Sequence, residues 1–98
     1  MDQLKIGDLK PGLSSFCIQG IISSIEEPKE VITKYGNKIK VSHAILEDES
    51  GSIVLTLWGE DSSKYKVGDK IFLENCYVSE FRGNLQLSVK KGGQIKLI

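Results

Sequence analysis

The sequence predicts an all-β fold, a small barrel of five main strands with one short helical turn. Its 98 residues alternate between β-like runs and closely spaced turns rich in Gly, Asn and Asp. A closed barrel is favoured over a sandwich because closure removes the exposed strand edges along which so short a β chain would aggregate. The length suits a single unit, so we expect residues 1–98 to form one domain.

The first half of the chain predicts two long strands. The first is expected over Phe16–Ile25, where a glycine in mid-strand, Gly20, is typical of a bend that lets one strand serve two sheets. Pro28 ends this region, and Thr33–Asn37 has the composition of a hairpin tip. Alternating side chains predict the second strand over 39–46, while the N-terminal apolar residues are expected to cover one end of the core.

A third strand and a helical turn follow an acidic turn at Glu47–Gly51. The strand is expected over Ser52–Trp58, because Ile53, Leu55 and Leu57 alternate with other residues. Residues 60–65 then predict a single helical turn, capped by one of two side chains, Asp61 or Ser62.

The fourth and fifth strands complete the predicted barrel. In the fourth, over 70–78, apolar residues at Ile71 and Leu73 are followed by Cys76 and Val78, so the alternation changes and a bulge is expected near Asn75. A turn at 82–84 leads into the fifth strand, and a short terminal strand is expected over 94–98. The fold prediction is a five-stranded OB-like barrel with the helical turn between strands 3 and 4.

Composition and residue spacing exclude several functional classes. Thirteen acidic and thirteen basic residues balance, which argues against a histone-like polycation but not against a basic cluster on one face. Cys17 and Cys76 lack zinc-ligand spacing and are expected to fill the core in a reducing compartment. His43, the sole histidine, is expected to be structural. Without a catalytic triad, a phosphate loop or paired metal ligands, we expect no enzyme, no cofactor and no metal site.

The expected location is the cytoplasm. The sequence contains no apolar run near the ~20 residues that a membrane span requires. The segment Met1-Asp2-Gln3 is followed by no hydrophobic stretch of the kind that a secretory signal contains.

One aromatic side chain is predicted to point away from the core. Trp58 shares its alternation with Val54 and Thr56, opposite to the apolar face of the third strand. An indole on the solvent side of a strand often binds a ligand, although covering a barrel end is an equally good interpretation from this residue alone. Tyr77, in the fourth predicted strand, and Phe81, shortly after it, are the other two aromatic candidates.

Five short motifs follow one another along the chain in the order found in a known family: Leu55–Gly59, Gly68-Asp69, Glu74–Tyr77, Phe81–Gly83 and Leu85–Leu87. Together they resemble the simple single-OB single-stranded DNA-binding proteins of archaea and the related eukaryotic sensors of single-stranded DNA. The resemblance implies that Trp58, Tyr77 and Phe81 stack on successive bases. This sequence differs from the eukaryotic proteins at Ser88, where those proteins carry a further aromatic residue.

The expected function is to coat and protect single-stranded DNA in replication, recombination and repair, largely without sequence preference, in a nucleoid-associated protein that is a monomer in isolation. Base stacking is supplemented by a second set of expected contacts to phosphates and base edges: Lys34, Tyr35, Lys38, Lys40, Thr56, Arg82, Gln86, Ser88 and Lys90. Two alternatives stay open. One is an OB-fold interaction subunit with protein partners in a larger replication or repair complex. The other is a domain that binds single-stranded RNA or tRNA, since stacking alone does not distinguish RNA from DNA.

Overall fold

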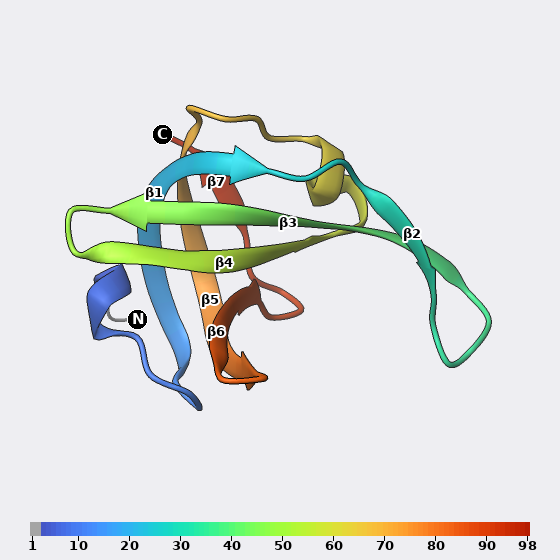
Figure 1. Ribbon diagram of the computed structural model, residues 1–98, viewed down its shortest axis with the longest axis horizontal. Coiled ribbons are helices and arrows are strands. Elements are labelled where there is room, and N and C mark those ends of the chain that lie inside the picture. The colour runs from blue at the N-terminus through green and yellow to red at the C-terminus, as the bar shows by residue number, and fades with distance from the viewer. Residues whose placement is uncertain (1–2) are drawn as a thin grey trace.

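The computed structural model describes residues 3–98. The segment Met1-Asp2-Gln3, which was expected to carry no secretory signal, therefore lies partly outside the described residues. Figure 1 shows the elements in chain order: η1 (Ile6–Asp8), β1 (Ser14–Ile25), β2 (Lys29–Ile32), β3 (Lys38–Asp48), β4 (Gly51–Trp58), η2 (Gly59–Ser63), β5 (Lys70–Phe81), β6 (Asn84–Val89) and β7 (Ile95–Leu97). Neither short helix within 3–98 is long and apolar enough to cross a membrane.

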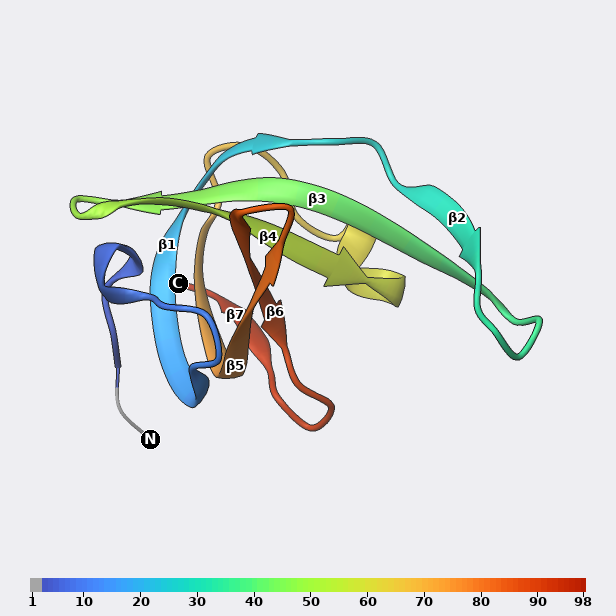
Figure 2. The same cartoon turned by 60° about the horizontal axis from the view of Figure 1, so that its bottom comes forward.

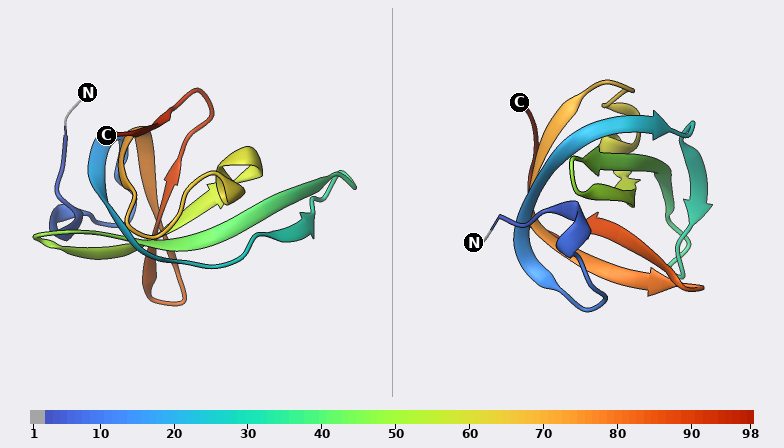
Figure 3. Two further views of the ribbon diagram at one scale, coloured as in Figure 1. Left: turned by 90° about the horizontal axis from the view of Figure 1, so that it is seen from above. Right: turned by 60° about the vertical axis from the view of Figure 1, so that its left-hand side comes forward.

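Five of the strands close into a barrel. The strand order β1-β3-β4-β6-β5 returns to its start because β1 also pairs with β5. The view at the right of Figure 3 shows the strands curving around a common interior. All barrel pairings are antiparallel except the seam between β4 and β6, where Val54 lies opposite Gln86 and Leu55 opposite Leu87. With η2 between the third and fourth barrel strands, the predicted five-stranded barrel is confirmed.

The bend predicted in the first strand is confirmed at Gly20. Residues 14–21 of β1 pair with β5, and residues 21–25 pair with β3, so one strand serves two parts of the barrel. A Cβ atom on Gly20 would lie 2.7 Å from the carbonyl oxygen of Glu47 and 2.9 Å from Cγ of Leu46. The two strands therefore approach each other more closely than any side chain at this position allows.

The predicted bulge in the fourth barrel strand is also confirmed. Phe16 lies opposite Cys76, but Ile18 lies opposite Leu73, so β5 contains one more residue than β1 in this interval. Asn75 has a φ of +58°, in the left-handed region that bulges often use. The bulge turns the residues on both sides of it toward the core, which lets one strand keep its apolar face across the change in alternation.

The core is formed by aliphatic side chains from all five barrel strands, and both cysteines belong to it. Cys17 and Cys76 are free and buried, which confirms their predicted packing role. Burial raises the pKa of the Cys76 thiol to about 12, and the neighbouring Cys17 adds to the shift. A thiol so far from ionising is a poor nucleophile.

The N-terminal segment covers one end of the barrel, as predicted, and Asp48 holds it in place. Ile6 is buried there, and its N–H donates to Oδ2 of Asp48 at 3.0 Å. Oδ1 of Asp48 accepts from the N–H and hydroxyl of Ser50 and from the N–H of Gly51. Desolvation acts to raise the pKa of Asp48, but these four hydrogen bonds outweigh it and lower the pKa below 3.8.

Replacing Asp48 by asparagine is expected to lower the melting temperature at neutral pH, because the hydrogen bonds to the ionised carboxylate are lost. The native pKa lies below the unfolded one, so this stabilisation is complete above pH ~4 and disappears as pH falls through the native pKa. Thermal unfolding followed by circular dichroism at pH 7 and pH ~3 measures this, with Glu49→Gln as the matched control on the same turn. Equal differences between wild type and variant at both pH values would contradict the prediction.

Three details of the sequence prediction are wrong. Residues 29–32 form the additional strand β2, which pairs with β3, although Pro28 was expected to end the strand region. The helical turn η2 has no side-chain cap from Asp61 or Ser62; instead the hydroxyl of Ser62 donates to the carbonyl oxygen of Gly59. Finally, β5 extends beyond the predicted end at Val78 to residue 81, which brings a further aromatic side chain onto the strand.

Candidate nucleic-acid interface

Trp58 lies on the outer face of β4, as its alternation predicts. Ile53, Leu55 and Leu57 are buried in the core, whereas 46% of the surface of Trp58 is exposed. The indole occupies the last position of the strand, next to η2. It is therefore available to a ligand on the outside of the barrel.

Strand pairing places the outward residues of β3, β4, β6 and β5 beside one another. Their register forms a series of cross-strand pairs: Val41 with Trp58, His43 with Thr56, Val54 with Gln86, Ser88 with Tyr77, and Gln86 with Ser79. Directly opposed residues on neighbouring strands point to the same face. The three aromatic residues therefore share one face, although they come from different strands.

This face contains an open groove with a volume of about 420 Å³. The groove brings together six of the predicted site residues: Trp58, Tyr77, Phe81, Thr56, Gln86 and Ser88. Phe81 is 58% exposed, whereas Thr56 and Ser88 are only 7% and 6% exposed and form the floor between the rings. The arrangement offers flat apolar surfaces separated by small hydroxyl groups, which suits planar ligands with polar edges.

Four further groove residues were not predicted: Val31, Val41, His43 and Ser79. His43, expected to be structural, faces the groove, and its Nδ1 lies 3.7 Å from Oε2 of Glu26. The available signal was its alternation with the core residue Ala44, which places it on the outer face. Val31 could not be found in this way because β2 was not recognised as a strand.

Arg82 accompanies Phe81 at one end of the groove. Its φ of +52° in the turn between β5 and β6 brings the guanidinium carbon to 5.1 Å from the centre of the Phe81 ring. This is a cation–π contact. A positive charge therefore lies beside an exposed aromatic ring at this end of the groove.

Three of the four predicted lysines lie on the arm formed by β2 and β3, which extends beyond the barrel in Figure 1 and in the left panel of Figure 3. The fourth, Lys90, directly follows β6 and does not line the groove. Lys34 and Tyr35 occupy the tip, with Nζ of Lys34 5.2 Å from the centre of the Tyr35 ring. Lys38 and Lys40 alternate with Val41, which lines the groove. They therefore lie on the other face of the arm, and the structure does not bring them to the groove.

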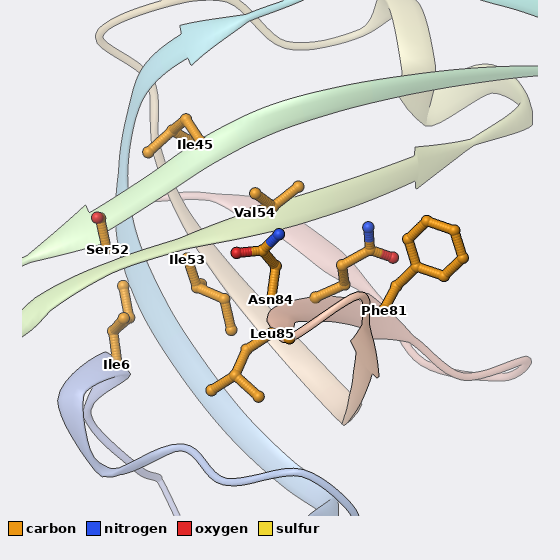
Figure 4. Close-up of a pocket in the computed structure, with 10 residues that line it drawn as sticks. Ile6, Ile45, Ser52, Ile53, Val54, Phe81, Asn84 and Leu85 are labelled. Atoms are coloured by element: carbon orange, nitrogen blue, oxygen red, sulfur yellow. The ribbon is translucent and has the colours of Figure 1, made fainter.

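A second hollow of about 450 Å³ continues from the groove at Phe81 and Gln86. Figure 4 shows Ile6, Ile53 and Leu85 between η1 and the β4 and β6 strands, with Phe81 at the other side. None of the described residues that line it is charged. Among residues 3–98, no group of three or more His, Cys, Asp or Glu side chains is arranged to hold a metal ion.

Comparison with known families agrees with this geometry. Residues 13–97 match the family model of the single-stranded DNA-binding protein Ssb-like OB fold. The chain belongs to this Ssb-like family. Over 84 residues it is 34% identical to the single-stranded DNA-binding protein Ssb of Saccharolobus solfataricus. This match covers 86% of the chain but only 56% of the Saccharolobus protein, so the chain spans little more than half of that relative.

Solved OB-fold structures are similar to this Ssb-like chain over nearly its whole length. The second OB-fold domain of replication protein A from Methanococcus maripaludis superposes with a TM-score of 0.82 at 32% identity, covering 98% of this chain and 94% of that one. An OB domain from Thermoplasma acidophilum gives a TM-score of 0.82 at 26% identity, covering 100% of this chain and 88% of that one. The Ssb-like fold thus extends over the whole barrel.

Proposed function

We propose that residues 1–98 act as a single OB-fold domain that binds single-stranded DNA largely without sequence preference. The observation that carries the proposal is the groove that presents Trp58, Tyr77 and Phe81 on one face of the barrel. Every base has a π-face, so rings in this arrangement bind a single strand whatever its sequence. The similarity to the single-stranded DNA-binding protein Ssb of Saccharolobus solfataricus supports the same ligand.

The polar and charged neighbours of the rings suit the rest of a nucleotide. Gln86, Ser88 and Thr56 lie on the groove floor, where they can donate to and accept from base edges. Arg82 and Lys34, each beside an aromatic ring, supply positive charge for backbone phosphates. As part of this proposal, the activity serves in the cell to coat and protect exposed strands during replication, recombination and repair, and the protein acts in the cytoplasm with the nucleoid.

Trp58 provides the direct test. Titration with oligo-dT is expected to quench its fluorescence, because a stacked base contacts the indole. Affinity should fall as salt rises, with a slope of about −0.7 in log K against log salt for each phosphate contacted. A duplex of the same length is the control and should bind much more weakly, since its bases are not free to stack. Equal affinity for the duplex and the single strand would contradict the proposal.

A second candidate is an OB-fold unit of a larger replication or repair assembly. The observation that favours it is the similarity to one domain of a larger protein, replication protein A from Methanococcus maripaludis. Co-purification of a stoichiometric protein partner, without measurable binding to oligonucleotides, would select this candidate. Competition between oligo-dT and oligo-U decides between DNA and RNA as the preferred strand.

A further inference from the structure

The groove continues past Trp58 into a cleft on the other side of the ring. This cleft has a volume of about 210 Å³ and shares Thr56 and Trp58 with the groove. One wall is η2, which contributes Asp61, and the other is the loop between β6 and β7. Figure 2 shows this loop projecting beyond the end of β6. A strand stacked on Trp58 therefore has an open path beyond the last ring.

Positive charge is found at both ends of the groove. Arg82 lies beside Phe81 at one end, and the cleft beyond Trp58 is lined by Lys90 and Lys91 together with Asp61. Lys91 is exposed and takes part in none of the ion pairs formed within residues 3–98. Nζ of Lys90 lies 3.4 Å from the hydroxyl of Ser15, also without an acidic partner there. These two lysines therefore make the Trp58 end of the groove attractive to a polyanion as well.

The loop that carries these lysines is held in place by its backbone. The N–H of Lys90 donates to the carbonyl oxygen of Asn75 at 2.9 Å, and the N–H of Gly93 donates to the carbonyl oxygen of Lys90 at 2.8 Å. Gly93 packs so closely that an added Cβ would clash with the carbonyl oxygen of Glu74. A loop fixed in this way loses little conformational entropy when it binds a ligand.

We propose that the strand continues past Trp58 into this cleft, where Lys91, together with Lys90, binds a backbone phosphate of a nucleotide outside the aromatic stack. The inference rests on the proposed function and extends the site beyond its three rings. Asp61 on the opposite wall repels a phosphate, so it confines the backbone to the loop side of the cleft.

The test compares oligo-dT of about 4 nucleotides, which the rings can accommodate, with oligo-dT of about 12 nucleotides. Lys91→Ala is expected to bind the short oligonucleotide like wild type and the long one about 3–10-fold more weakly, with a salt slope smaller by about 0.7. Asp61→Asn should do the opposite and strengthen binding of the long oligonucleotide alone. Lys70→Ala is the matched control, because Lys70 is also exposed but pairs with Ile21, away from the groove.

The outcomes separate this inference from the proposed function. If wild type binds neither oligonucleotide, the proposed function itself fails. If wild type binds both and Lys91→Ala behaves like Lys70→Ala at both lengths, only the cleft inference is overturned. A loss that is equal for short and long oligonucleotides also overturns it, because the contact then lies within the aromatic stack. Thermal unfolding of each variant confirms that the substitutions leave the fold intact.

Discussion

Replacing Trp58 or Phe81 by alanine is expected to weaken the binding of oligo-dT by about 1–3 kcal/mol for each ring, or roughly 5- to 150-fold. Each substitution removes a stacking surface while leaving the core untouched, because both side chains are about half exposed on the outer face. The double variant should lose most of the affinity. Fluorescence anisotropy of a labelled oligonucleotide measures all three variants, including those that lack the intrinsic fluorophore.

Two controls define what such a loss means. Val67→Ala removes an equally exposed apolar side chain that lies outside the groove, and it should bind like wild type. Trp58→Phe retains a ring and should keep a large part of the affinity that Trp58→Ala loses. If both alanine variants at the rings bound like wild type, the rings would not be the stacking surfaces.

Gly20→Ala is expected to destabilise the fold by about 1–3 kcal/mol, a large effect for a single added methyl group. The new Cβ would meet the carbonyl oxygen of Glu47 at 2.7 Å, and that backbone cannot move without disturbing the pairing of β1 with β3. The melting temperature should fall by about 4–8 °C for each kcal/mol lost in a chain of this size. Thermal and urea unfolding measure the change.

Ser24→Ala serves as the control for this substitution, because Ser24 is exposed on the same strand. It should change the melting temperature little. An unchanged melting temperature for Gly20→Ala would mean that β1 and β3 can move apart locally to accommodate the methyl group without a cost in free energy. The close approach would then not be a requirement of the fold.

The parts of the fold that follow from alternation were predictable. The bulge at Asn75 was visible because the apolar residues on either side of it change alternation, and only one backbone irregularity reconciles them. The strand β2 was not predictable in this way. Its sequence Lys-Glu-Val-Ile is exposed throughout, so no buried face imposed a pattern on it. Its pairing with β3 depends on the geometry of the hairpin rather than on burial.

The candidate site likewise contains residues that alternation could predict and residues that it could not. Trp58 could be placed on the outer face from its own strand, and the family resemblance supplied Tyr77 and Phe81. Alternation places His43 on the outer face, but its position in the groove also depends on its lying opposite Thr56, and cross-strand register is not visible in a single sequence. Lys38 and Lys40 were grouped with the site because they lie close in sequence to Lys34. In a β-strand, however, neighbouring side chains point to opposite faces, and Lys38 and Lys40 lie on the face of β3 away from the groove.

The short parallel seam between β4 and β6 has a mechanical consequence. Two residue pairs join these strands, so this is the narrowest connection in the closed barrel. Trp58 lies at the end of β4, while Tyr77 belongs to β5 on the far side of the seam. A ligand that contacts both rings spans the pairing of β4 with β6 from outside, and its binding free energy adds to the free energy needed to separate these two strands. Binding therefore stabilises the closed barrel at the pairing that has the fewest residue pairs.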